Sequence, residues 1–167
     1  MKFKTLGLIL TLLIIALISY FLITQIVTKV QQKTSSESMV LKIPNFTDKD
    51  KLLQQSTPSV FIAFHPECEH CQYEAKSINE KRKDLQDIQF VLFTSASDSA
   101  THSFSKTYGL DTLKNIHVVV DSTNEMWRLF DVKTIPTVFI YNAQKQLVKR
   151  FNGETKIEAI IKYATPQ

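Results

Sequence analysis

The chain has 167 residues, of which 44% are hydrophobic and 22% charged, a composition that excludes a chain disordered throughout its length. Its three glycines and five prolines exclude a collagenous or low-complexity chain, and its two cysteines are too few for a disulfide-rich scaffold. The net charge is +4, but no stripe of lysines and arginines is interleaved with aromatic residues, so we expect no nucleic-acid partner.

The N-terminal segment is long and apolar enough to span a membrane. Residues 6–27 carry no charged side chain and would form a helix of about 33 Å, close to the thickness of the bilayer core. The alternative is a cleaved signal peptide, but this should have a shorter apolar stretch and small residues at a cleavage site, which residues 28–33 lack. We therefore expect a cytoplasmic flank at residues 1–5, an uncleaved anchor in contact with membrane lipid at 6–27 and a polar linker at 28–39.

Positive charges lie on both sides of this anchor and give only a slight bias for its orientation. Lys2 and Lys4 precede the apolar segment, and Lys29 and Lys33 follow it. The short flank before the anchor favours a chain that starts in the cytoplasm. We therefore expect everything after residue 27 to lie outside the cytoplasm.

From about residue 40 onward, patterns of strands and helices alternate. They predict strands at 59–64, 88–93, 116–120, 137–141 and 146–151, and helices at 67–85, 98–108, 124–130 and 156–163. The first strand is apolar almost throughout, as is typical of a strand covered on both faces. The turn at 142–145 makes the last two strands a hairpin. We predict one α/β domain over residues 40–167, built as a three-layer α/β/α sandwich around a mixed sheet.

Cys68 and Cys71 form a C-x-x-C motif between a predicted buried strand and a helix, a position typical of thiol–disulfide redox centres. Unpaired N–H groups and the dipole at a helix N-terminus favour the thiolate form of Cys68, the expected attacking group. Cys71 lies one turn later and should be more covered, so that it would resolve the mixed disulfide. Two buried free thiols, a static disulfide and half of a zinc site are the alternatives.

Three acidic or imidazole side chains accompany the cysteines. Glu74 lies on the helical face of Cys71 that should pack on the sheet, and a half-buried carboxylate there would exchange protons with Cys71. The alternative is an exposed carboxylate. Within the motif, a protonated His70 would stabilise a thiolate and Glu69 would oppose it, unless both merely face solvent at the start of the helix.

Pro136 opens the predicted strand 137–141. A proline facing the C-x-x-C turn would keep the disulfide accessible and would leave the backbone at Ile135 free to pair with a substrate. Cis bonds are almost confined to X-Pro, but only about one X-Pro bond in twenty is cis, so the residues alone do not predict the isomer of this bond.

These features together resemble the membrane-anchored thiol–disulfide oxidoreductases of the bacterial TlpA and ResA group, which have the thioredoxin fold. The resemblance rests on the single N-terminal anchor, Phe64-His65-Pro66-Glu67-Cys68-Glu69-His70-Cys71, Glu74 and Ile135-Pro136-Thr137. It implies a cis bond before Pro136 and an extra strand and helix between Cys71 and Pro136. It also implies protein disulfide or thiol substrates, a membrane electron-donor protein, no cofactor, and a domain on the periplasmic side of the bacterial inner membrane.

The motif departs from this group at two positions. Glu67 replaces the tryptophan that usually precedes the first cysteine, and His70 replaces a frequent proline, as in the oxidising DsbA-type dipeptide. Peroxiredoxins are less similar, because residues 64–67 lack the threonine or serine that precedes their peroxidatic cysteine.

Two functions are compatible with these residues. The first is a protein thiol–disulfide oxidoreductase, more a reductase than an oxidase. The second is a copper-binding module of the thioredoxin fold, in which soft thiolates and an imidazole would hold Cu(I). The candidate imidazoles are His65, His70, His102 and His117. Such modules generally have a wider cysteine spacing, so we assign no metal ligand.

Overall fold

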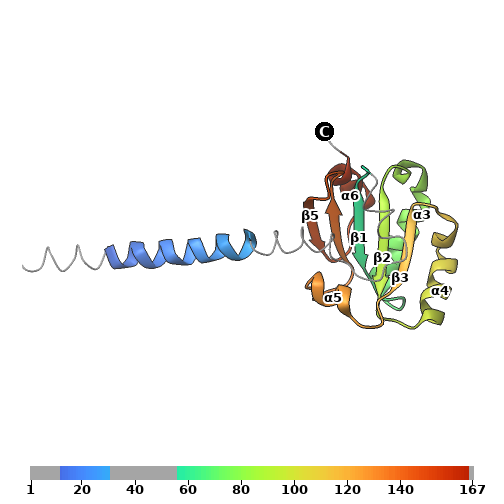
Figure 1. Cartoon of the computed structure of the whole chain (residues 1–167), viewed down its shortest axis with the longest axis horizontal. Helices are drawn as coiled ribbons and strands as arrows, with labels where there is room; N and C mark the ends of the chain where they lie inside the picture. The colour runs from blue at the N-terminus through green and yellow to red at the C-terminus, as the bar shows by residue number, and fades with distance from the viewer. Residues whose placement is uncertain (1–11, 31–55, 166–167) are drawn as a thin grey trace, which may run out of the picture. The chain divides into compact units, whose positions relative to one another are not determined.

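The computed structural model describes residues 12–30 and 56–165, and the chain divides into two compact units, Met1–Ser35 and Ser36–Gln167. The first unit contains an apolar helix, Leu12–Val30, with a mean hydropathy of 2.0 (Figure 1). By length and composition this helix can cross a membrane. The expected flank at 1–5, the first residues of the expected anchor, and residues 31–39 of the linker lie outside the described residues.

The second unit is built on a five-stranded mixed sheet with the strand order β3-β2-β1-β4-β5. The strand β1 pairs in parallel with β2, and β2 with β3, whereas β4 is antiparallel to both β1 and β5. The strands are β1 (Ser59–Ala63), β2 (Gln89–Thr94), β3 (Ile116–Val120), β4 (Thr137–Tyr141) and β5 (Leu147–Asn152). The expected hairpin at 142–145 is confirmed, since it joins β4 to β5.

Among the described residues, helices connect β1 to β2, β2 to β3 and β3 to β4, and a last helix follows β5 (Figure 1). The α-helices are α3 (Glu69–Glu80), α4 (Asp98–Thr107), α5 (Glu125–Leu129) and α6 (Ile157–Ala164), and the 3-10 helices are η1 (Arg82–Leu85) and η2 (Leu110–Thr112). The elements α4 and β3 occupy the interval between Cys71 and Pro136 in which the resemblance implies an additional helix and strand.

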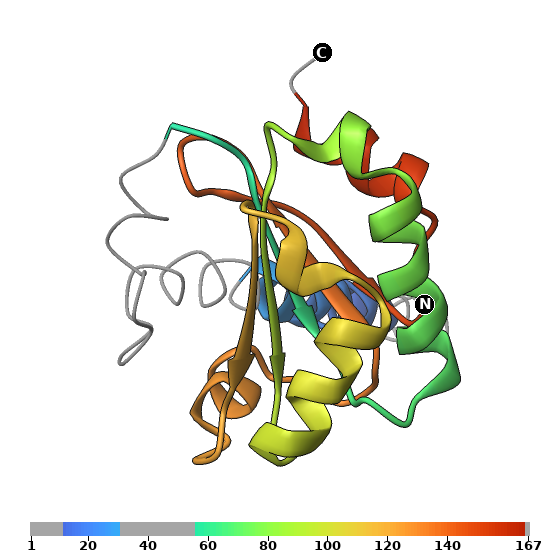
Figure 2. The same ribbon diagram turned by 90° about the vertical axis from the view of Figure 1, so that its right-hand side faces the viewer.

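The side chains of the sheet pack into two cores on its opposite faces, because successive residues of a strand point to opposite sides. In β1, Val60 and Ile62 belong to one core, and Phe61 and Ala63 to the other. The first core is covered by α3, α4 and α6 and the second by α5, as Figure 2 shows. The predicted three-layer α/β/α sandwich with a mixed sheet is therefore confirmed.

The helix predicted at 67–85 is shorter in the structure. It begins at Glu69 because the chain first turns at Pro66 and Glu67, with the backbone N–H of Cys68 donating to the carbonyl of His65 over 3.1 Å. It ends at Glu80, and the 3-10 helix η1 then carries Leu85 into the same core. The turn at Pro66 and Glu67 therefore places Cys68 directly before the first helical residue.

Candidate functional site

The C-x-x-C motif lies at the N-terminus of α3, directly after β1. Cys68 is the N-cap residue, and its Sγ atom accepts the backbone N–H of Cys71 over 3.4 Å. Both thiols are free; Cys68 is half-buried, whereas Cys71 is only 3% exposed. The expected difference in exposure between the two cysteines is therefore confirmed, and only Cys68 is open to another molecule.

The buried position of Cys71 disfavours its thiolate. Burial raises the pKa of the Cys71 thiol, and the neighbouring Cys68 and Glu74 side chains raise that pKa further. The backbone of His65 acts in the opposite direction. Because a thiol must lose its proton before it can attack a disulfide, Cys71 needs a nearby proton acceptor.

Glu74 is placed to be that acceptor. It is only 2% exposed, and no described residue donates a hydrogen bond to either of its carboxylate oxygens. Burial raises the pKa of Glu74 to about 8, and the charge of Glu154 contributes to the rise, while the backbone amide of Thr155 lowers it. The carboxyl is thus more buried than the half-buried position that the sequence indicates, and the alternative of an exposed carboxylate is wrong.

The loop before β4 forms a second side of the site. The bond between Ile135 and Pro136 is cis, as predicted. Thr137 pairs with Ala63, the last residue of β1, so the proline loop and the C-x-x-C turn lie at the same end of the sheet. The carbonyl of Pro136 accepts the backbone N–H of Gly153 over 2.8 Å, which connects this loop to the segment that follows β5.

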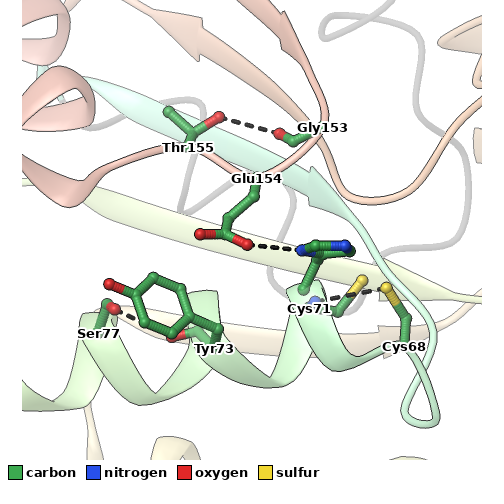
Figure 3. A network of polar contacts seen from close by, with 8 residues as sticks. Cys68, Cys71, Tyr73, Ser77, Gly153, Glu154 and Thr155 are labelled. Atoms are coloured by element: carbon green, nitrogen blue, oxygen red, sulfur yellow. Dashed lines mark hydrogen bonds and ion pairs between the residues drawn. The ribbon is translucent and has the colours of Figure 1, made fainter.

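That segment contributes a residue that the sequence patterns missed. Oε2 of Glu154 lies 2.6 Å from Nδ1 of His70, and Figure 3 shows the Glu154 side chain extending toward the motif from the strand-to-helix loop. The two residues are 84 positions apart. The one available signal was the predicted end of the last strand near residue 151, which directs the following loop toward the proline. Glu69 is exposed in the first turn of α3.

Within residues 12–30 and 56–165, no group of three or more histidine, cysteine, aspartate or glutamate residues is arranged to hold a metal ion. His102 is exposed on α4, and His117 lies on β3. The copper-binding alternative therefore has no ligand cluster in the part of the chain that the structure describes.

Comparison with known proteins gives the same picture of the domain. Residues 39–150 match the AhpC/TSA family. The chain is 30% identical to the thiol-disulfide oxidoreductase ResA of Bacillus subtilis, over 71% of this chain and 69% of that protein.

Two solved structures show the same fold. One is a secreted Mycobacterium tuberculosis disulfide oxidoreductase homologous to E. coli DsbE, with a TM-score of 0.57 and 22% identity over 70% of this chain and 85% of that one. The other is StoA from Bacillus subtilis, with a TM-score of 0.56 and 17% identity over 67% and 85% of the two chains. The chain therefore belongs to the AhpC/TSA family, has the thioredoxin-like fold and is a homologue of ResA.

Proposed function

We propose that Cys68 and Cys71 are the redox couple with which this thiol–disulfide oxidoreductase reduces protein disulfides outside the cytoplasm. The observation that carries the proposal is the arrangement of a half-buried cysteine at the N-cap of α3, a buried cysteine one turn later, and an unpartnered buried carboxylate behind it. In this arrangement the accessible cysteine attacks the substrate disulfide, and the buried cysteine resolves the mixed disulfide that results.

The reaction has two thiol–disulfide exchanges. The Cys68 thiolate attacks one sulfur of the substrate disulfide, forms a mixed disulfide and releases the other substrate sulfur as a thiolate, which takes a proton from solvent. Cys71 then gives its proton to the Glu74 carboxylate and attacks Sγ of Cys68. The second substrate thiolate leaves. The substrate disulfide is reduced by two electrons, and Cys68 and Cys71 are oxidised to a disulfide.

Each remaining residue of the site has a role in this sequence. Glu74 exchanges the proton of Cys71 because it lies on the same buried face, three residues further along the helix. Pro136 lies at the same end of the sheet as the accessible sulfur and leaves the backbone at Ile135 to align a substrate strand. His70, when protonated, favours the Cys68 thiolate, and Glu69 opposes this effect.

The buried thiol of the couple does not stabilise the reduced form by ionisation. Strong oxidants of this fold stabilise their reduced form, chiefly through an ionised thiol. Here burial and the neighbouring Glu74 disfavour ionisation of Cys71. The reduced form consequently gains little stability from ionisation of Cys71, and the measured potential decides the direction.

In the same proposal, residues 6–27 cross the bacterial inner membrane once, residues 28–39 form a tether, and residues 40–167 are the periplasmic domain. The described part of the apolar helix supports this, because the hydroxyls of Thr24 and Thr28 donate to the carbonyls of Phe21 and Thr24, as polar groups in lipid must do. The anchor would hold the domain near a membrane protein that returns electrons through its own thiols.

A thiol-trapping redox titration of the full-length chain in detergent, read by mass spectrometry, tests this function. We expect a reversible two-electron couple between Cys68 and Cys71, with a potential near the roughly −270 mV of thioredoxin. A potential near the roughly −120 mV of DsbA would reverse the proposed direction, and the absence of a couple would refute the function. Cys71→Ser should accumulate mixed disulfides with substrate proteins, whereas the matched variant Cys68→Ser should form none.

A further inference from the structure

The loop between β5 and α6 is held firmly against the redox site. Gly153 has a φ of 105°, a conformation that glycine adopts without a Cβ penalty, and its N–H reaches the carbonyl of Pro136. The hydroxyl of Thr155, itself only 5% exposed, donates to the carbonyl of Gly153 over 3.1 Å. Glu154, between these two residues, therefore has a fixed backbone at the edge of the motif (Figure 3).

The Glu154 side chain contacts the exposed part of the motif and acts electrostatically on its buried part. Its carboxylate forms an ion pair with His70, whose side chain is 69% exposed. Its charge also raises the pKa of Glu74, which lies behind Cys71. Glu154 is thus the group that connects the C-x-x-C dipeptide with the buried proton acceptor.

Among the described residues, the elements packed around α3 place no charged side chain in the buried interior against that helix. The strands β1 and β4 beneath the helix carry no charged residue, and Cys71 is the titratable neighbour of Glu74 on α3 itself. Within α6 and at its N-cap, Lys156, Glu158 and Lys162 are all exposed. Glu154 is the charged side chain that raises the pKa of Glu74, in addition to burial.

We propose that Glu154 is a positioning residue of the redox site: fixed by its loop, it holds the His70 imidazole beside the motif and acts through its charge on the transfer of the Cys71 proton to Glu74. The inference rests on the proposed function of Cys68, Cys71 and Glu74. Removal of the Glu154 charge makes Glu74 easier to ionise.

The two exchange steps can be followed separately with an aromatic disulfide that releases coloured thionitrobenzoate. In the reduced full-length chain in detergent, attack by Cys68 releases one thionitrobenzoate, and resolution by Cys71 releases the second. The rate of the second release against pH gives the midpoint that depends on Glu74. We expect Glu154→Gln to move this midpoint to lower pH by about half to one pH unit, the size of effect that one partly exposed charge has on a neighbour.

Matched variants separate this role from a general effect of charge or folding. Glu154→Asp, which keeps the charge, should leave the midpoint close to that of the unchanged protein. Glu158→Gln removes an exposed carboxylate of α6 and should leave the midpoint in place. The inference is overturned if Glu154→Gln leaves the midpoint unchanged or if Glu158→Gln moves it equally. Failure of the proposed function would instead appear as a missing second release in the unchanged protein.

Discussion

The Sγ atom of Cys68 lies 3.4 Å from the backbone nitrogen of Cys71 and accepts its N–H, so the accessible thiol of the motif is also the N-cap of α3. One atom therefore serves both the chemistry and the stability of the helix. When Cys68 enters a mixed disulfide, its Sγ atom stays at the N-terminus of α3. When Cys68 is released as a thiolate, the peptide dipoles of the helix favour its negative charge.

Substitutions of Cys68 should separate these two roles. Serine retains an oxygen that can cap the helix, whereas alanine leaves the N–H of Cys71 without an acceptor. We expect Cys68→Ser and Cys68→Ala to abolish disulfide reduction equally. Only Cys68→Ala should lower the free energy of unfolding, by about 1 kcal/mol. Urea unfolding of the reduced full-length chain, followed by the fluorescence of Trp127, the single tryptophan, measures the difference. Equal stability of the two variants would contradict the capping role.

A second capping interaction lies on the other face of the sheet. The Asp121 carboxylate, which is 7% exposed, accepts the backbone N–H groups of Glu125 at 2.9 Å and Trp127 at 3.1 Å. We expect Asp121→Ala to destabilise the domain by about 1 to 2 kcal/mol and Asp121→Asn by less, because the amide keeps one acceptor oxygen. Unfolding monitored by tryptophan fluorescence checks both. Ser122→Ala, at the exposed neighbouring position, is the control and should change little.

Much of the fold follows from local sequence patterns. The strands at 116–120 and 137–141 have their predicted bounds, because each is an apolar run with polar or turn-forming residues at its ends. The helix predicted at 67–85 was too long for a physical reason. Leu85 keeps the helical spacing of the buried face, yet it reaches that core from the 3-10 helix η1 rather than from α3. Hydrophobic periodicity alone does not distinguish the two.

The site was predictable only where its residues are close together in the sequence or where a proline constrains the backbone. Cys68, Cys71 and the cis bond before Pro136 belong to this class. The near-complete burial of Glu74 depends on the tertiary packing that surrounds α3, which includes contacts with α6. The partnership of Glu154 with His70 depends on where the loop after β5 lies. The predicted hairpin indicates only that this loop returns toward Pro136, and the contact with His70 itself arises from the tertiary fold.

Membership of the AhpC/TSA family makes reaction with peroxide a natural comparison. The peroxiredoxin threonine or serine is absent from residues 64–67, where the structure instead has a turn and the N–H of Glu67 donates to Nδ1 of His65 over 3.3 Å. We expect hydrogen peroxide to oxidise Cys68 no faster than it oxidises the thiols of the urea-unfolded chain, while disulfide reduction is far faster in the folded protein. Stopped-flow measurement of both reactions tests this. Rapid peroxide consumption that Cys68→Ser abolishes would contradict it.

Glu74 should make the stability of the domain fall as the pH rises. In the unfolded chain this carboxyl loses its proton near its ordinary value of 4.5, whereas in the folded protein burial raises the pKa to about 8. Between these values the unfolded state ionises and the folded state does not, so stability is greatest below about pH 4.5, declines up to about pH 8 and is level above it.

Replacing this carboxyl by a neutral amide should remove that decline. Glu74→Gln should equal or slightly exceed the unchanged protein at pH 5 and should be more stable by about 4 kcal/mol at pH 8.5, an order-of-magnitude value from 1.36 kcal/mol per pKa unit. Urea unfolding of the reduced chain at the two pH values measures it, and Cys71 affects both proteins alike. The exposed carboxylate of Glu80 gives the matched control, because Glu80→Gln should show no such pH-dependent gain. A gain for Glu74→Gln that is the same at both pH values would mean that the buried carboxyl is ionised throughout this range.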